Sequence, residues 1–259
     1  AGMVGRAIAL DLVKNFEVTS IDISETSLQI LRSRNDKIRT LKSDLNDHEN
    51  YQQLLAPFDF VVTAVPGFMG YKTLESVIKT KKDVVDISFL PENALDLDSL
   101  AKENNVTAIV DCGVAPGMSN LVLGYYNERM QVTDFECMVG GLPKIKTPPF
   151  EYKAPFSPID VIEEYTREAR FVKKGKLVTK PALSDAELID FEKAGPLESF
   201  NTDGLRSLLF TMSHIPNMKE KTLRYPGHIN LMKAFIKAGF FSSAEINFRG
   251  CELSPLQFS

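Results

Sequence analysis

Residues 1–111 alternate short runs of β-branched residues with segments whose apolar positions recur at helical spacing. The helical spacing predicts helices over residues 4–15, 24–34, 50–55, 71–80 and 97–104. The β-branched runs predict strands over residues 17–22, 38–41, 60–65, 83–88 and 106–111. Several of these runs are apolar almost throughout, which is typical of parallel strands buried on both faces. The alternation therefore predicts an α/β fold with a Rossmann-type, doubly wound parallel sheet.

The pattern changes after Gly113. A turn at residues 115–120 leads into a helix, and strands of alternating polarity, Pro-rich loops and charged turns follow. We therefore expect a dinucleotide-binding domain over residues 1–114. An α+β domain for substrate binding and dimerisation, with a mostly antiparallel or mixed sheet, is expected over residues 115–259. We also expect the first strand of the Rossmann sheet to lie upstream of Ala1 and the second domain to be truncated.

The overall composition is that of an ordinary globular protein, with 259 residues of which 44% are hydrophobic and 25% are charged. A net charge of -4 offers no concentration of positive charge for nucleic acid or for an anionic membrane surface. The 3 cysteines form no C-x-x-C pair, so we expect no metal site and a reducing, cytoplasmic location. A small molecule is the expected partner.

A glycine motif opens the first predicted helix. Gly2 and Gly5 stand where the second and third glycines of G-x-G-x-x-G would fall, with Met3 and Val4 between them. Such a turn brings the backbone up to a pyrophosphate at the positive end of a helix. The alternative is close helix packing without a ligand. Asp22 ends the next predicted strand, where a carboxylate accepts hydrogen bonds from the adenosine ribose. Because a carboxylate repels a 2′-phosphate, the motif predicts NAD as the cofactor.

Other strand ends point to the same crevice, because ligands of open parallel sheets lie outside the carboxyl ends of the strands. Val65, Pro66 and Gly67 follow one predicted strand, and Ser88 closes the next. Asp44, after the second predicted strand, is expected to reach the adenine amino group. We predict that these residues contact the dinucleotide. The alternatives are ordinary turn residues and, for Asp44, a cap.

Residues 111–120, with the sequence DCGVAPGMSN, resemble the D-x-G-x-x-P-G turn that joins the two domains in the saccharopine dehydrogenase superfamily. Further segments resemble one branch of it, the L-lysine 6-dehydrogenases, at residues 64–67, 86–92, 139–143, 157–165, 203–207 and 222–228. The resemblance runs in order over essentially the whole chain. It implies NAD-dependent oxidation of the ε-amino carbon of L-lysine, hydrolysis of the imine with release of ammonia, and a homodimer.

A free amino acid substrate brings a carboxylate, and arginine binds carboxylates in a bidentate manner. Arg206 and Arg224 stand in the matched segments and are predicted to bind the substrate. The alternative for each is an internal ion pair or a loop anchor. Asp86 and Asp111 lie at the carboxyl ends of predicted strands and are expected to bind the substrate amino groups. Their alternative role is to cap loops.

Three residues are candidates for proton transfer. His228 titrates near neutrality, so it is a candidate base for the substrate ammonium or for a water molecule. It is equally well explained as a structural histidine. Tyr152 and Lys153 precede a Pro-containing turn, and desolvation in a cleft would make the lysine a base. The alternative is a strand end with a solvated lysine.

Two other functions compete with lysine oxidation. A saccharopine dehydrogenase, or a reductase of a similar amino acid conjugate, would act on a larger substrate whose additional carboxylates require more cationic groups. A non-catalytic dinucleotide-binding module is the second alternative, because the first glycine of the pyrophosphate loop would lie upstream of Ala1. Turnover of lysine and of saccharopine separates the three hypotheses.

Overall fold

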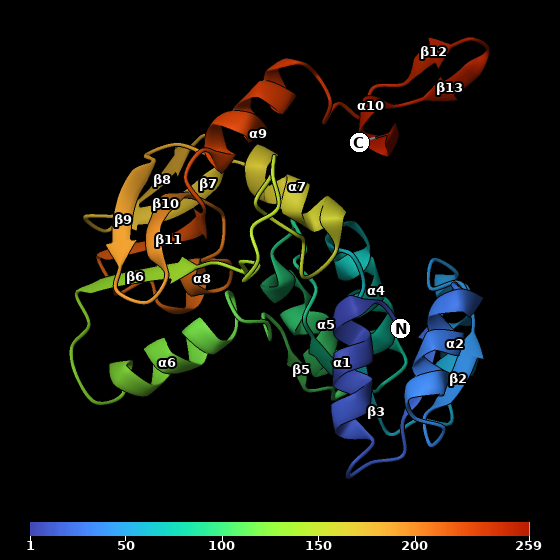
Figure 1. Ribbon diagram of the computed structural model, residues 1–259. Helices are drawn as coiled ribbons and strands as arrows, with labels where there is room; N and C mark the ends of the chain where they lie inside the picture. The colour runs from blue at the N-terminus through green and yellow to red at the C-terminus, as the bar shows by residue number, and fades with distance from the viewer. Residues whose placement is uncertain (259) are drawn as a thin grey trace. The chain divides into compact units, whose positions relative to one another are not determined.

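The computed structural model of the protein describes residues 1–258 (Figure 1). The chain divides into two compact units, of which unit 1 is Ala1–Met118 and unit 2 begins at Ser119. The sequence pattern had suggested a boundary after residue 114. The two units are described separately below.

Unit 1 alternates helices with short strands. Its helices are α1 (Met3–Leu12), α2 (Glu25–Arg34), α3 (Tyr51–Leu55), α4 (Gly67–Lys79) and α5 (Asp98–Asn104), with 3-10 turns η1 (His48–Asn50) and η2 (Ala94–Leu97). Its strands are β1 (Thr19–Asp22), β2 (Arg39–Lys42), β3 (Phe60–Thr63), β4 (Asp83–Asp86) and β5 (Ala108–Ile109). These elements follow the predicted order.

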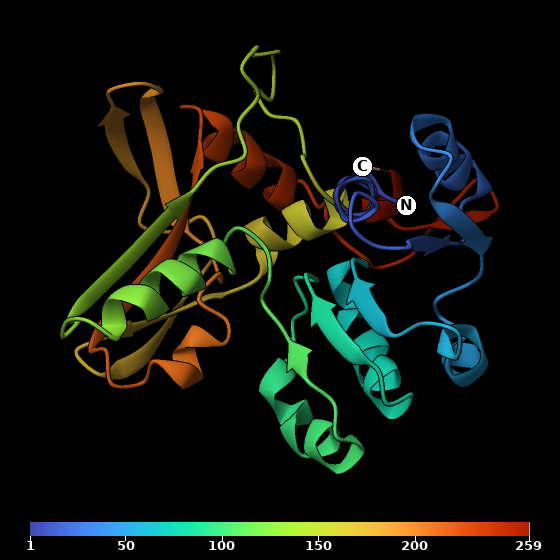
Figure 2. The same cartoon turned by 90° about the horizontal axis from the view of Figure 1, so that it is seen from below.

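The strand pairings described in unit 1 are parallel, which confirms the predicted fold class. β1 pairs with β2, and β4 lies between β3 and β5. Figure 2 shows the β3-β4-β5 piece, in cyan and green, with its helices beside it. Leu74, Val77 and Ile78 of α4 pack on Val84 of β4, because helical spacing places all three on one side of the helix. A further strand upstream of Ala1 stays a prediction.

Local signals in the sequence set several element ends in unit 1. Ser24 is the N-cap of α2, and its hydroxyl accepts a hydrogen bond from the Ser27 backbone N–H at 3.2 Å. β3 and β4 are shorter than predicted at their carboxyl ends. Pro66, which lacks a backbone N–H for the ladder, is the N-cap of α4. Ser88 folds back and donates to the Asp86 carboxylate, so β4 ends at Asp86.

Unit 2 is an α+β unit, as expected. Its strands are β6 (Asp134–Val139), β7 (Ala169–Lys173), β8 (Lys176–Lys180), β9 (Glu187–Phe191), β10 (Gly195–Asn201), β11 (Asn217–Arg224), β12 (Ile246–Phe248) and β13 (Cys251–Leu253). Its helices are α7 (Pro158–Thr166), α8 (Leu208–Thr211), α9 (His228–Lys237) and α10 (Pro255–Phe258), together with α6 (Met118–Asn127), which starts at the last residue of unit 1.

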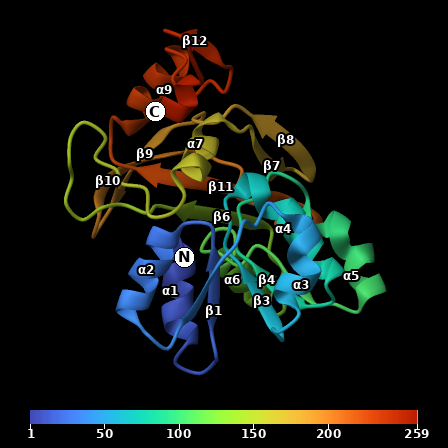
Figure 3. The ribbon, with the colours of Figure 1, turned by 90° about the vertical axis from the view of Figure 1, so that its right-hand side faces the viewer.

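The main sheet of unit 2 is mixed. Its described strands have the order β8-β7-β11-β10-β9, with antiparallel pairing, and β6 pairs with β11 in parallel (Figure 3). Alternation along β11 puts Met218, Glu220, Thr222 and Arg224 on the same face of the sheet. Phe200 of β10 pairs with Thr222 and therefore shares that face.

Two apolar clusters cover this face of the sheet. One joins Phe200 to Tyr165 of α7 and to Ile229 and Met232 of α9. The other joins Met218 to residues of α6, α8 and the loops around them. Between the two clusters, the middle of β11 carries buried polar and charged side chains instead of apolar ones. Among residues 1–258, none of the helices has the length and apolar character needed to span a bilayer.

Candidate functional site

The start of α1 carries the predicted pyrophosphate loop. Gly2 is the N-cap of α1, and no described side chain caps this end of the helix. Met3 is exposed and Val4 half-buried in the first turn. A Cβ added to Gly2 would meet no described atom within 4 Å, so the backbone here is open to a ligand. An added Cβ on Gly5 would make an ordinary contact with Ala64 at 3.5 Å. This open helix N-terminus suits an anionic group.

Asp22 lies beside the start of α1, at the carboxyl end of β1. Its Oδ2 is 2.9 Å from the amino nitrogen of Ala1, and its Oδ1 accepts from the Ser24 backbone N–H at 2.8 Å. The side chain remains 22% exposed. The carboxylate is therefore next to the glycine loop, where a ribose acceptor is required. Its contact with a ribose stays a prediction.

Asp44 and residues 65–67 follow the ends of β2 and β3. Asp44 is exposed, and its Oδ1 accepts from the backbone N–H and the side-chain amide of Asn46, at 2.9 and 3.1 Å. This is the turn cap named above as its alternative role. Val65 and Pro66 are half-buried, whereas Gly67 is buried as the first residue of α4. Their contacts with a dinucleotide stay predictions.

A buried hydrogen-bonded group links the ends of β3 and β4. Asp86 is 0% exposed, and its Oδ1 accepts from the hydroxyls of Thr63 and Ser88, the latter at 2.8 Å. Its Oδ2 is buried without a hydrogen-bond partner among the described residues. Burial raises the pKa of Asp86, and the nearby charge of Asp111 adds to the rise. An added Cβ on Gly70 would lie 2.9 Å from Cβ of Ser88, so a glycine is required where α4 passes this group.

Asp111 and Cys112 follow β5 and lie close to Asp86. The Cys112 backbone N–H donates to the Asp86 carbonyl oxygen at 3.2 Å. Asp111 is half-buried and has a φ of 57°. Burial raises the pKa of the Cys112 thiol, and the two carboxylates reinforce this. The half-buried Cys112 therefore carries a protonated thiol at neutral pH.

Arg224, predicted to bind the substrate carboxylate, is buried and satisfied inside unit 2. Its NH2 donates to Glu164 of α7 at 2.6 Å, its NH1 to the Leu223 carbonyl at 3.0 Å, and its Nε to the Tyr165 hydroxyl at 3.1 Å. The Tyr152 ring lies over the guanidinium at 4.1 Å. Burial raises the pKa of Glu164, and the Arg224 charge opposes that rise. This is the internal ion pair given as the alternative role.

His228, the candidate base, is also enclosed. Its Nδ1 lies 2.8 Å from the Phe150 carbonyl oxygen, which accepts, so Nδ1 carries the proton. Nε2 lies 3.0 Å from the Tyr165 hydroxyl, which donates to it. Burial lowers the pKa of His228, and the charge of Arg224 lowers it further. Both ring nitrogens are occupied, so the geometry agrees with the structural role rather than with a base.

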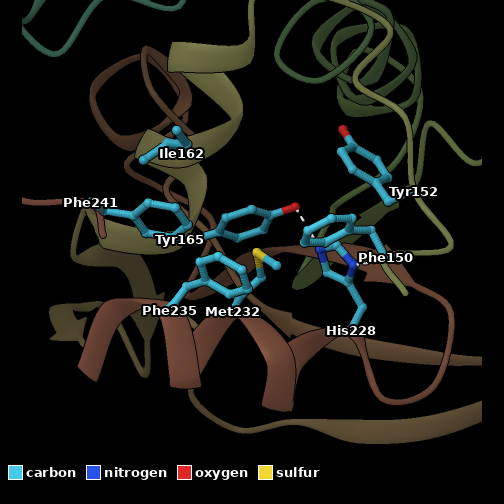
Figure 4. Close-up of a pocket in the computed structure, with 8 residues that line it drawn as sticks. All are labelled: Phe150, Tyr152, Ile162, Tyr165, His228, Met232, Phe235 and Phe241. Carbon is cyan, nitrogen blue, oxygen red and sulfur yellow. Dashed lines mark hydrogen bonds between the residues drawn. The ribbon is translucent and has the colours of Figure 1, made fainter. Parts of the chain in front are cut away.

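Tyr152 and Lys153 differ in environment. Burial raises the pKa of Tyr152, whose ring packs edge-on against His228 with centroids 5.3 Å apart. Lys153 is exposed, so the expected desolvated lysine is not found. A pocket of about 160 Å³ lies between α7, α9 and the loop before α7. Its lining consists of Phe150, Tyr152, Ile162, Tyr165, His228, Met232, Phe235 and Phe241 (Figure 4). Rings dominate this lining, and the Tyr152 hydroxyl points away from the Tyr165–His228 hydrogen bond (Figure 4).

Arg206, the second predicted carboxylate ligand, belongs to a buried charge cluster. Asp203 accepts from Arg206 NH1 at 2.7 Å and from Arg170 Nε and NH2 at 2.9 and 2.8 Å. Burial would raise the pKa of Asp203, but the two guanidinium groups outweigh it and hold this pKa below its usual value. Arg206 is 5% exposed. The structure therefore gives Arg206 an internal carboxylate partner.

Comparison with known proteins covers the same two parts of the chain. The saccharopine dehydrogenase NADP binding domain matches residues 1–109, and the saccharopine dehydrogenase C-terminal domain matches residues 113–259. The chain belongs to the saccharopine dehydrogenase family. The family expected from residues 111–120 is thus confirmed.

Relatives within the saccharopine dehydrogenase family carry two kinds of name. The chain is 27% identical over 214 residues to saccharopine dehydrogenase [NADP(+), L-glutamate-forming] of Pyricularia oryzae, covering 78% of this chain and 48% of the relative. It is 22% identical over 256 residues to mitochondrial alpha-aminoadipic semialdehyde synthase of Rattus norvegicus, covering 93% of this chain and 28% of the relative. The chain thus spans about half or less of these relatives.

A solved structure of the same family supports the fold. Apo saccharopine dehydrogenase (L-Glu forming) from Saccharomyces cerevisiae matches with a TM-score of 0.70 and 22% identity, over 93% of this chain and 57% of that one. The similarity confirms a Rossmann-like unit followed by a unit with a largely antiparallel sheet. The lysine 6-dehydrogenase branch is not among the names of these relatives.

Several residues that contact Asp86 in unit 1 or Arg224 in unit 2 had no clear signal in the sequence. Thr63 ends β3, and its position at a carboxyl strand end was the available clue to its contact with Asp86. Glu164 and Tyr165 lie in the matched segment 157–165, but their contacts with Arg224 join residues about 60 positions apart. Such pairings require the tertiary structure.

Proposed function

We propose that this chain is the dinucleotide-binding and substrate-binding part of an oxidoreductase that oxidises a C–N bond of an amino acid. The observation that carries the proposal is the open N-terminus of α1 at Gly2, with the Asp22 carboxylate beside it at the end of a parallel strand. The helix N-terminus suits a pyrophosphate, and the carboxylate suits the hydroxyls of a ribose. A bound nicotinamide dinucleotide would supply the hydride acceptor.

The protein's own contribution is to orient the amine and to handle protons. We propose Asp86 and Asp111, at the carboxyl ends of β4 and β5, as the residues that bind the amine. The buried Oδ2 of Asp86 has no partner among the described residues, and burial raises the pKa of this carboxyl, which favours its protonated form more than in an exposed aspartate. Thr63 and Ser88 orient this carboxyl through its other oxygen.

The released amine distinguishes two versions of this reaction. A lysine 6-dehydrogenase releases ammonia after hydrolysis of the imine, and a glutamate-forming saccharopine dehydrogenase releases glutamate. The names of the relatives support saccharopine. The internal pairing of Arg206 and Arg224 supports lysine, because neither guanidinium is left open for the additional carboxylates of a conjugate.

The deciding experiment incubates the full-length protein with either dinucleotide and with L-lysine or saccharopine, following reduced nicotinamide absorbance together with ammonia and glutamate. Ammonia from lysine, in a one-to-one ratio with reduced dinucleotide, establishes the lysine reaction. Glutamate from saccharopine establishes the other version. Dinucleotide binding without turnover of either substrate would support the non-catalytic module and overturn the proposal.

The second part of the proposal is a preference for NAD. The name of the matching family domain, and that of the Pyricularia oryzae relative, contain NADP. Asp22 favours NAD, because its carboxylate repels a 2′-phosphate and accepts from ribose hydroxyls. We expect Asp22→Ser to weaken NAD binding about 10- to 100-fold, the value of a hydrogen bond to a charged group. Asp98→Ser is the matched control, because Asp98 is an exposed aspartate of α5, paired with Lys102, that no prediction places at the dinucleotide. Tighter binding of NADP by the unmodified protein would refute the preference.

The remaining expectations from the sequence stay predictions. They are a homodimer, a cytoplasmic location and an amino acid as the small-molecule partner. Sedimentation of the full-length protein with and without dinucleotide tests the first of them.

A further inference from the structure

Glu220 lies in the polar gap between the two apolar clusters of unit 2. It is 4% exposed, in the middle of β11. Its Oε2 accepts from the Thr202 hydroxyl at 2.5 Å, and the Thr202 oxygen lies 2.9 Å from the Thr222 hydroxyl. No ion pair joins Glu220 to a lysine or arginine among residues 1–258. A buried carboxylate without a cation is costly, so the neutral form is the stable one here.

The turn at residues 202–206 packs directly on this carboxyl group. A Cβ added to Gly204 would overlap with Cδ and Oε2 of Glu220, so the turn backbone touches the side chain without space for water. Every residue of the turn is buried. Its Leu205 belongs to the apolar cluster of Met218, and its Asp203 binds Arg170 of β7. The turn therefore connects the sheet face to its neighbours through Glu220.

Burial and the neighbouring acidic groups disfavour a negative charge on Glu220, and together they outweigh the hydrogen bonds from Thr202 and the Gly204 backbone, which favour it. The titratable and charged groups around it are Asp203 and Arg206 from the turn, Glu164 from α7, Cys137 from β6 and Arg224 further along β11. The guanidinium groups of this set are bonded to Asp203 and Glu164. The acidic groups remain as the nearest charges to the Glu220 carboxyl.

We propose that Glu220 is a proton-dependent latch, which holds residues 202–206 against the sheet when protonated and releases this turn when it loses its proton. Ionisation puts a charge between the sheet and the Gly204 backbone, where water cannot reach it unless the turn moves away. The turn is the element that moves in this opening, because β11 is held by paired strands on both sides, whereas the turn is held by side-chain contacts.

The pH range of the release follows from thermodynamic linkage. Burial raises the pKa of Glu220 to about 8, and the charges of Glu164 and Asp203 add to the rise. An open turn hydrates the carboxyl and returns its pKa to the ordinary value of 4.5. Between these two values, each pH unit raises the open population about tenfold, because the open form loses the proton first. Above about pH 8 both forms are ionised and the population levels off.

Hydrogen exchange of the full-length protein, followed by mass spectrometry from pH 5 to 9, tests this latch. After division by the intrinsic exchange rate, protection of residues 202–206 should fall about tenfold per pH unit up to about pH 8 and then stay constant. Glu220→Gln should abolish this slope, because the amide does not titrate. Glu136→Gln changes an exposed glutamate of β6 that pairs with Lys219 of β11, and it should keep the slope. Residues 229–236 of α9 report on global unfolding and should not change.

Two results overturn the latch. One is pH-independent protection of residues 202–206 in the unmodified protein. The other is the same slope in Glu220→Gln as in Glu136→Gln. If Glu220→Gln does not fold, ¹³C-labelled glutamate in the unmodified protein supplies the second measurement. A carboxyl signal that titrates near pH 8 together with the turn protection supports the latch, and its absence refutes it.

Discussion

Tyr165 is the residue through which Arg224 and His228 of unit 2 are connected. Its hydroxyl accepts from Arg224 Nε at 3.1 Å and donates to His228 Nε2 at 3.0 Å. Tyr165→Phe keeps the ring but leaves a buried guanidinium N–H and a buried imidazole lone pair without partners. A neutral orphan costs about 1–3 kcal/mol and a charged one more, so we expect a loss of about 4 kcal/mol.

Thermal unfolding measures this loss. For a chain of this size, about 4 kcal/mol corresponds to a decrease in Tm on the order of 10 °C in the transition of unit 2. Tyr126→Phe is the matched control, because Tyr126 is 52% exposed and the same atom is removed. A decrease of less than about 2 °C for Tyr165→Phe would show that the hydrogen-bonded chain does not stabilise the fold. The double variant with His228→Phe should cost less than the sum of the single variants.

Four other variants follow from the same unit. Gly204→Ala should lower the stability by about 2 kcal/mol through overpacking. Gly124→Ala adds a Cβ inside α6 that would meet no described atom within 4 Å, so it should raise the stability by about 1 kcal/mol. Urea unfolding midpoints measure both glycine variants. Because the pKa of His228 is lowered, the unfolded chain binds the proton first, so stability should fall as the pH drops below about 6.5, and less in His228→Gln. Asp203→Asn should destabilise at neutral pH, and this difference should shrink as the pH falls below about 3.8 and vanish only below the lowered pKa of Asp203 in the folded protein, measured by urea unfolding across pH.

Much of unit 1 could be predicted from the sequence, because its signals are local. A helix needs apolar residues at a spacing of three to four, and a buried parallel strand needs a short apolar run. Both lie within a few neighbouring positions, and so does the Ser24 cap of α2. The Asp22 position relative to Gly2 is also a matter of spacing along one βαβ segment. The fold class, the order of the elements and the family could therefore be predicted from the sequence.

The state of the charged residues in unit 2 was decided by the tertiary structure alone. Arginines expected to face a substrate carboxylate instead bind the protein's own carboxylates: Arg206 binds Asp203 of the same turn, and Arg224 binds Glu164, 60 positions away in the chain. The segment 217–224, with the sequence NMKEKTLR, has the charge pattern of an exposed strand, yet Glu220, Lys221 and Arg224 are all buried. Whether a charged side chain meets water or protein depends on which helices and loops cover the sheet. That coverage arises from contacts between distant segments, so no pattern of neighbouring residues encodes it.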